Sequence, residues 1–256
     1  LYEMIEKVRN IAKKHVLETV NIRKHLHAHP ELSFQEYETS KYIQSVLKKH
    51  DIPFTTGHVE TGIIATIKGK NPDTKEILLR ADLDALPITE DNNVEYKSKN
   101  EGVMHACGHD FHSASLIGTA LILNELKEDY NGTIKFVFQP GEEKLPGGAS
   151  LMIKEGVLEN PSPSAILGQH VFPDLPAGKV GFRPGMYMAS CDELYLTVKG
   201  KGGHAALPHK FTDTVLIACE IISSLQTIVS RHAKPDIPSV LSFGKINTTG
   251  GATNII

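Results

Sequence analysis

Short apolar segments that alternate with amphipathic ones are the feature that most limits how this chain can fold. Three of the apolar segments are strand-like: residues 76–82 (EILLRAD), 133–140 (TIKFVFQP) and 164–171 (SAILGQHV). Helix-like segments lie between them, at about residues 112–127 and 147–156. Apolar strands separated by helices are typical of a parallel or mixed sheet that is covered on both faces. We therefore predict an α/β protein.

The segments before this alternation are predicted to add two helices and one strand. Apolar residues recur at helical spacing in the first 50 residues, and Pro30 is expected to separate two helices. Residues 62–69 (GIIATIKG) have the apolar, β-branched composition of a strand. All of these elements are expected in the same α/β domain.

The strand-like segments end in side chains that can bind a metal ion or move a proton. These side chains are Asp82, Asp84, Glu142, Glu143 and His170. In open α/β sheets, ligands bind beyond the carboxyl ends of the strands. We therefore expect these acids and this histidine to meet at one edge of the sheet.

A fourth segment, residues 102–115 (GVMHACGHDFHSAS), brings more candidate ligands to the same edge, just before a predicted helix. Cys107 and His109 are two residues apart, so in extended backbone their side chains lie on the same side. His105 and His112 are expected to be supporting or structural residues. Thiolate, imidazole and carboxylate together favour zinc or a neighbouring transition metal over calcium or magnesium. More ligands are present than one tetrahedral site needs, which favours two metal ions.

Two other interpretations of these residues remain open. Cys107 is also a candidate nucleophile, but the histidine base and oxyanion hole that it would need have no diagnostic pattern in a sequence. A metal-dependent peptide-binding protein without activity would keep the ligands, but it has no need of both Glu142 and Glu143. The motifs H-E-x-x-H, G-x-S-x-G and G-x-G-x-x-G and the phosphate-binding P-loop are absent from the sequence.

The sequence pattern changes after about residue 186. Residues 192–200 (DELYLTVKG) and 239–246 (SVLSFGKI) have the alternation of strands, and an amphipathic helix is expected at 212–230. We therefore predict a metal-binding catalytic domain at residues 1–185 and a smaller α+β domain at 186–256. The second domain is expected to be incomplete because no closing element follows its last strand.

The composition argues against several classes of protein. The net charge of −3 provides no electrostatic basis for binding nucleic acid or an anionic membrane. No apolar run approaches the roughly 20 residues of a membrane span, and the first residues lack the core of a signal peptide. Three scattered cysteines are too few for a disulfide framework, so a cytoplasmic location is expected. Thirteen histidines, several of them clustered, favour a metal site.

Six segments occur in the order and spacing of the M20 metallopeptidase family, and the chain resembles its amidohydrolase branch. These segments are RKHLHAHPELSFQEYET, RADLDALPITE, MHACGHDFH, QPGEE, GQHV and GKGGHAALPH. The resemblance implies a catalytic domain with two divalent transition-metal ions (zinc, or manganese, cobalt or nickel) and an inserted lid or dimerisation domain. It also implies hydrolysis of the amide bond of N-acylated amino acids or small peptides by a metal-bound hydroxide.

The resemblance implies a role for each matching residue of the metal centre. The residues that match metal ligands are Cys107, His109, Glu143 and His170. Cys107 resembles the ligand that lies between the two metal ions, and Asp84 matches the aspartate that supports the site. One more histidine ligand is expected from a segment beyond the end of this chain, so the chain is expected to be part of a longer protein.

Three further residues match positions that act on the substrate. Glu142 resembles the general base of the reaction. His204, in a glycine-rich lid loop, resembles the histidine that polarises the scissile carbonyl, often in the site of the partner subunit of a homodimer. Asn254 matches a lid residue that holds the carboxylate end of the substrate. Gly141 departs from the family, in which many relatives have alanine, and this change is expected only to loosen the turn.

Overall fold

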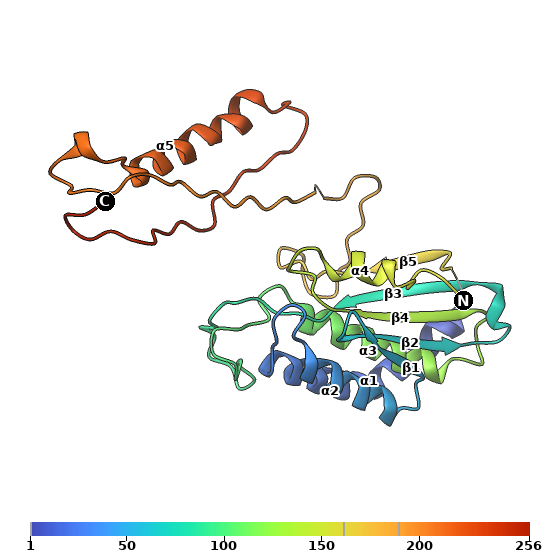
Figure 1. Ribbon diagram of the computed structural model, residues 1–256. Coiled ribbons are helices and arrows are strands. Elements are labelled where there is room, and N and C mark those ends of the chain that lie inside the picture. Colours follow the sequence, from blue (N-terminus) through green and yellow to red (C-terminus); the bar gives the residue numbers. More distant parts are fainter. Residues whose placement is uncertain (1, 161, 189) are drawn as a thin grey trace. The chain divides into compact units, whose positions relative to one another are not determined.

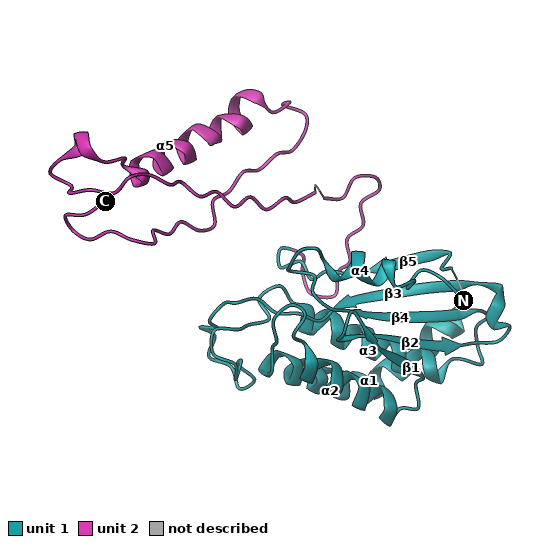
Figure 2. Ribbon diagram, in the orientation of Figure 1, with its two compact units in different colours: residues 1–174 teal, residues 175–256 magenta. Residues whose placement is uncertain are grey.

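The computed structural model describes residues 2–160, 162–188 and 190–256. The chain divides into two compact units, Leu1–Asp174 (unit 1) and Leu175–Ile256 (unit 2), as Figure 2 shows. The boundary lies eleven residues before the one predicted at residue 185.

Unit 1 is built on a mixed five-stranded sheet with the order β1-β2-β4-β3-β5. The strands are β1 (Phe54–His58), β2 (Gly62–Lys68), β3 (Glu76–Asp82), β4 (Thr133–Gln139) and β5 (Ala165–Gly168). β3 runs parallel to both of its neighbours, β4 and β5, whereas β2 is antiparallel to β1 and β4. The mixed sheet agrees with the prediction. β1 was not predicted because its sequence, FTTGH, is short and largely polar, and its three central residues are exposed.

Four helices cover the sheet: α1 (Tyr2–Ala28), α2 (Tyr37–Lys49), α3 (His109–Glu125) and α4 (Gly148–Lys154). Figure 1 shows α1, α2 and α3 on one face and α4 on the other. Unit 1 has a hydrophobic core on each face of the sheet, because successive side chains of β4 point to opposite faces. Phe136 and Phe138 are fully buried in the larger core with residues of α1, α2 and α3, whereas Val137 packs against Met152 of α4 on the opposite face.

The register of the parallel strands brings their carboxyl ends together. Asp82 at the end of β3 pairs with Gln139 at the end of β4, and Arg80 pairs with Gly168 at the end of β5. α3 begins beside this edge at His109. Its His109 side chain bonds to Asp84, and its Ser113 side chain bonds to the carbonyl of Asp82, the last residue of β3. The fold therefore delivers four separate segments to one edge of the sheet, as expected from the strand ends.

Unit 2 contains the predicted helix but not the predicted strands. α5 (Thr214–Thr227) begins at Asp213, whose side chain accepts a hydrogen bond from the Leu216 amide (2.9 Å), and it continues into a π-helical turn. The predictions of strands at 192–200 and 239–246 are wrong: neither segment is paired in a sheet. Alternation marks which side chains share a face, but a strand also needs a neighbouring backbone. Leu194 and Tyr195 are 85% and 90% exposed, so neither face of the first segment is covered.

The helical segment Thr214–His232 is 19 residues long with a mean hydropathy of 1.3. By length and composition alone it could cross a membrane, although the sequence has no uninterrupted apolar run of this length. The high mean hydropathy comes from the isoleucines, leucines and valines of this segment. Core helices of soluble proteins can have the same length and mean hydropathy, so this segment is weak evidence for a membrane span.

Candidate metal centre

His109, the first residue of α3, lies at the centre of the candidate site and is buried. Its Nδ1 donates a hydrogen bond to Asp84 Oδ1 (3.2 Å), because a carboxylate can only accept. Asp84 also accepts bonds from the Ser33 hydroxyl (2.6 Å) and the Glu143 amide (2.9 Å). Burial alone would raise the pKa of Asp84, but these bonds hold it below its usual range. Asp84 therefore remains a carboxylate that fixes the His109 ring with Nε2 free to bind a cation.

Three carboxylates surround the free nitrogen of His109. Its Nε2 lies 3.6 Å from Asp82 Oδ2, 3.8 Å from Glu142 Oε2 and 3.7 Å from Glu143 Oε1. Two ligand atoms that each lie ~2.1 Å from a tetrahedral metal ion are about 3.4 Å apart. His109 Nε2 and Glu143 Oε1 are both buried and have no hydrogen-bond partner among the described residues. Such unpaired atoms are rare in folded proteins, and a metal ion would satisfy both.

Cys107 and His170 approach His109 from two other segments. Cys107 Sγ lies 3.3 Å from His170 Nε2, and His170 Nδ1 donates to the Val171 carbonyl (2.7 Å). The ligand atoms of Cys107, His109 and His170 all lie within 4.8 Å of one another. Burial and the neighbouring carboxylates, Glu143 first among them, raise the pKa of Cys107 to about 12. A cation bound beside Cys107 would offset the negative charge of the neighbouring carboxylates and allow the thiolate to form.

Cys107 and His109 reach the same site through a turn and not through extended backbone. Gly108 has a left-handed φ of 87° and lies at the N-cap of α3. A Cβ atom at this position would overlap the Val171 side chain. The expectation that the two side chains lie on one side of an extended segment is therefore wrong in its geometry, because the chain turns into the helix between them.

His112 supports the centre from the next turn of α3. Its Nε2 accepts a hydrogen bond from the Val171 amide (2.9 Å), so its Nδ1 carries the proton and donates to Asp82 Oδ1 (2.7 Å). Arg80 donates to the other oxygen of Asp82 (2.6 Å). Burial opposes ionisation of Asp82, but His112 and Arg80 lower its pKa well below the usual range. Both ring nitrogens of His112 are engaged, in agreement with the supporting role expected from the sequence.

Glu142 and Glu143 are equally close to His109 Nε2 but differ in exposure. The Glu142 side chain is 42% exposed and that of Glu143 is 22% exposed. Burial and the neighbouring Glu143 charge raise the pKa of Glu142. A half-exposed carboxylate that holds a proton more readily is suited to proton transfer. The buried Oε1 of Glu143, to which no described residue bonds, is suited to metal binding.

The two predicted lid residues, His204 and Asn254, lie next to each other in unit 2. The Ala205 amide donates to the Asn254 carbonyl (2.9 Å), and His204 forms an isolated bridge with Ile255. His204 Nδ1 accepts a hydrogen bond from the Ala206 amide (3.1 Å), which places the ring proton on Nε2. The structure therefore brings these two residues together, and their action on the metal centre stays a prediction.

Two residues that hold acidic side chains near His109, Ser33 and His27, were not predicted from the sequence. Ser33 holds Asp84, and His27 holds Asp110, the residue after His109. His27 Nδ1 lies 2.7 Å from Asp110 Oδ2 and its Nε2 lies 3.1 Å from Glu90 Oε1. These two bonds raise the pKa of His27, chiefly through Asp110. Both residues belong to the segment RKHLHAHPELSFQEYET, but no spacing in it indicates which acid each one meets.

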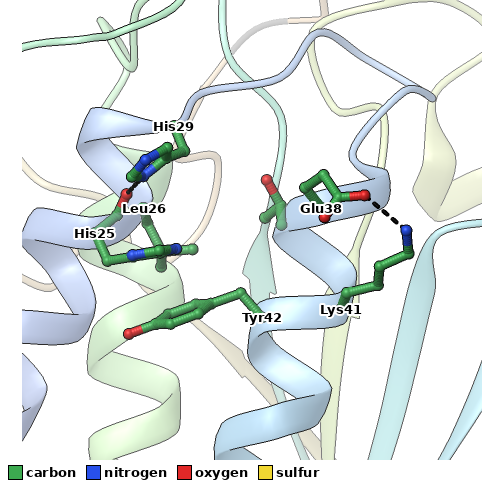
Figure 3. A pocket seen from close by; sticks show the side chains of 7 residues that line it. His25, Leu26, His29, Glu38, Lys41 and Tyr42 are labelled. Carbon is green, nitrogen blue, oxygen red and sulfur yellow. Dashed lines mark hydrogen bonds and ion pairs between the residues drawn. The ribbon is translucent and has the colours of Figure 1, made fainter.

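An open hollow of about 430 Å³ lies between the end of α1 and the start of α2 (Figure 3). The His25 ring stacks on Tyr42 with ring centroids 3.7 Å apart, and His29 Nδ1 donates to the His25 carbonyl (2.8 Å). Lys41 is paired with Glu38 (2.6 Å). The lining is therefore an aromatic wall beside a neutralised ion pair, unlike the cluster of free ligand atoms around His109.

Comparisons with known proteins agree with this geometry. The chain matches the family model of peptidase family M20/M25/M40 over residues 78–247. It is 46% identical to an N-acetylcysteine deacetylase of Bacillus subtilis, over 93% of this chain and 61% of that relative. It is 40% identical to an N-acyl-L-amino acid amidohydrolase of Geobacillus stearothermophilus, over 98% of this chain and 67% of that relative.

A solved structure from Bacillus subtilis, described as a dinuclear metal-binding peptidase from the M20 family, is also similar. It is 48% identical, with a TM-score of 0.64, over 68% of this chain and 48% of that chain. The chain spans about three fifths of the length of the curated relatives that it matches. The chain belongs to peptidase family M20/M25/M40, in its amidohydrolase branch.

Proposed function

We propose that this chain carries most of the metal centre of a hydrolase that cleaves the amide bond of N-acylated amino acids or small peptides. The observation that carries the proposal is the buried His109 Nε2, which has no hydrogen-bond partner in the described part of the chain and is surrounded by three carboxylate oxygens at 3.6–3.8 Å. The names of the two relatives, a deacetylase and an amidohydrolase, support this substrate class. A cytoplasmic location is proposed with it.

We propose that the centre holds two divalent transition-metal ions, zinc or manganese, cobalt or nickel. The proposed ligands are Cys107, His109, Glu143 and His170. Imidazole, thiolate and carboxylate are a donor set that suits these ions, and the B. subtilis peptidase with two metals supports the number. When bound, such ions activate a water molecule and polarise the carbonyl that it attacks.

The protein's own groups would carry the proton and orient the reactants. Glu142, whose Oε2 faces the centre, takes a proton from the attacking water and delivers it to the leaving amine nitrogen. Asp84 keeps Nδ1 of His109 protonated and its Nε2 turned to the centre. His204 donates a hydrogen bond to the substrate carbonyl oxygen, and Asn254 binds the substrate carboxylate. We propose that the lid forms a homodimer in which His204 serves the partner's site.

Removal and return of the metal should test this function. Dialysis of the protein, produced from its complete gene, against a chelator is expected to abolish hydrolysis of N-acetyl amino acids, because the nucleophile is no longer activated. Zinc, manganese, cobalt or nickel should restore it, as measured by release of the free amino acid. Activity that survives chelation but is lost on thiol alkylation would identify a cysteine hydrolase instead. Metal-dependent peptide binding without hydrolysis would identify a binding protein.

Alkylation of Cys107 should depend on the metal. With metal bound, Cys107 is expected to resist iodoacetamide because its sulfur is engaged, and after chelation it should become modified. The modification should be slow, since burial and Glu143 raise the pKa of this thiol. The exposed Cys191 and Cys219 are internal controls that should react in both states. Peptide mass spectrometry measures all three, and equal modification of Cys107 in both states would remove it from the metal site.

A further inference from the structure

The turn that carries Glu142 and Glu143 is tied to a buried carboxylate from a distant segment. Glu36 is fully buried. Its Oε1 accepts hydrogen bonds from the amides of Gly141 (2.8 Å) and Phe34 (2.9 Å), and its Oε2 accepts one from the Thr61 hydroxyl (2.8 Å). One acidic side chain therefore joins the turn after β4 to the segment before α2 and to the start of β2.

The position of Glu36 makes this use of its side chain unusual. Glu36 is the N-cap residue of α2, where an acidic side chain commonly accepts bonds from the first amides of its own helix. It makes no such bond. Glu31 accepts the amides of Glu38 (3.2 Å) and Thr39 (2.8 Å) instead. Because Glu31 performs the capping, the Glu36 carboxylate is free to reach the turn at Gly141.

The backbone of the turn leaves little freedom around this bond. Gly141 has a left-handed φ of 58°, and a Cβ atom on it would overlap the ring of Phe34, itself at a φ of 64°. The expectation that glycine here only loosens the turn is therefore wrong, because the ring occupies the space of a side chain. At the other end of the turn, the Glu143 amide is held by Asp84 (2.9 Å). The turn is thus fixed on both sides of Glu142.

We propose that Glu36 is a positioning residue for the metal centre. By accepting the hydrogen bond of the Gly141 amide, Glu36 sets the direction of the chain after β4. In this way the Glu142 carboxylate faces the reacting atoms and the Glu143 carboxylate faces the metal. Glu36 accepts its hydrogen bonds from the Gly141 amide, the Phe34 amide and the Thr61 hydroxyl, and none of these three residues is a proposed metal ligand. The roles of Glu142 and Glu143 on which this rests are those of the proposed function.

Replacing Glu36 with leucine removes the hydrogen-bond acceptor and puts an apolar side chain of similar size in the same buried position. At saturating zinc, kcat is expected to fall about tenfold to a hundredfold with a smaller change in KM, because small displacements of a catalytic group are costly. Zinc should also bind more weakly in a direct titration. Glu36→Gln should rescue both quantities, since its amide oxygen still accepts the Gly141 amide and its NH₂ group can donate to Thr61.

Thr61→Val is the matched control. It removes the hydrogen bond from the Thr61 hydroxyl to Glu36 and leaves the bond to the Gly141 amide in place. We therefore expect kcat and zinc affinity to stay near wild type even if the melting temperature falls. Gly141→Ala is the independent variant in case Glu36→Leu does not fold. It forces the turn away from Phe34 with Glu36 intact, and it should weaken zinc binding and lower kcat.

Three results would overturn the positioning role. The first is a Glu36→Leu protein with wild-type zinc affinity and kcat. The second is equal loss of kcat per bound zinc in Glu36→Leu and Thr61→Val, which indicates general destabilisation. The third is wild-type behaviour of Gly141→Ala. If the wild-type protein hydrolyses no acylated amino acid, the proposed function fails, while the zinc titrations still decide whether Glu36 positions the centre.

Discussion

Replacement of Glu142 by glutamine is expected to lower kcat about a hundredfold or more while metal content stays near wild type. Glutamine has the shape of glutamate but cannot accept the proton of the attacking water. The Glu142 side chain is 42% exposed, and its Oε2 lies 3.8 Å from His109 Nε2. Loss of the proton acceptor should therefore affect the chemical step more than the metal. Steady-state kinetics and metal analysis of the same sample measure the two effects.

Glu143→Gln is the matched partner of this variant, one residue further along the same turn. The Oε1 atom of Glu143 is buried and has no hydrogen-bond partner among the residues that the structure describes. Removing the charge of Glu143 should therefore reduce metal affinity, and excess metal should partly restore activity. Glu142→Gln should show no such rescue. If Glu142→Gln loses its metal and Glu143→Gln keeps it, the roles of ligand and base have been exchanged.

His204→Ala is expected to lower kcat by about a hundredfold to a thousandfold, the usual effect of removing one donor to a developing oxyanion. The ring proton of His204 is on Nε2, because Nδ1 accepts the Ala206 amide (3.1 Å), so Nε2 can donate to a substrate carbonyl. His204→Gln retains a donor and should lose less activity. Kinetics at saturating metal measures both variants.

Mixing two inactive variants tests whether His204 acts in the partner's site. A mixed dimer of His204→Ala and Glu142→Gln has one site with both groups intact if His204 acts across the dimer. After subunit exchange, activity should return to at most about half of the wild-type value per mixed dimer. Each variant incubated alone is the control. No recovery after verified exchange would mean that His204 acts within its own chain or has no part in catalysis.

Much of unit 1 could be predicted from local pattern. The apolar runs at β3 and β4 and the helix around residues 112–127 are close to the observed elements, because burial on both faces gives a strand an unmistakable composition. β1 could not be predicted, since it is half polar and is a strand only because it pairs with β2. In unit 2 the alternation of apolar and polar residues was misleading, because no described segment pairs with residues 192–200 or 239–246.

The candidate site, too, was predictable in its local features and not in its long-range contacts. The types of ligand and their place at strand ends are local features, so the sequence by itself determined that Asp84, Glu143 and His170 would meet at one edge. Which nitrogen of His109 faces the centre was decided by its bond to Asp84. The hydrogen bond from the Gly141 amide to Glu36 joins residues 105 positions apart, and no periodic pattern in the sequence indicates it. Periodicity records burial and backbone direction, whereas such long-range hydrogen bonds exist only after the elements have packed.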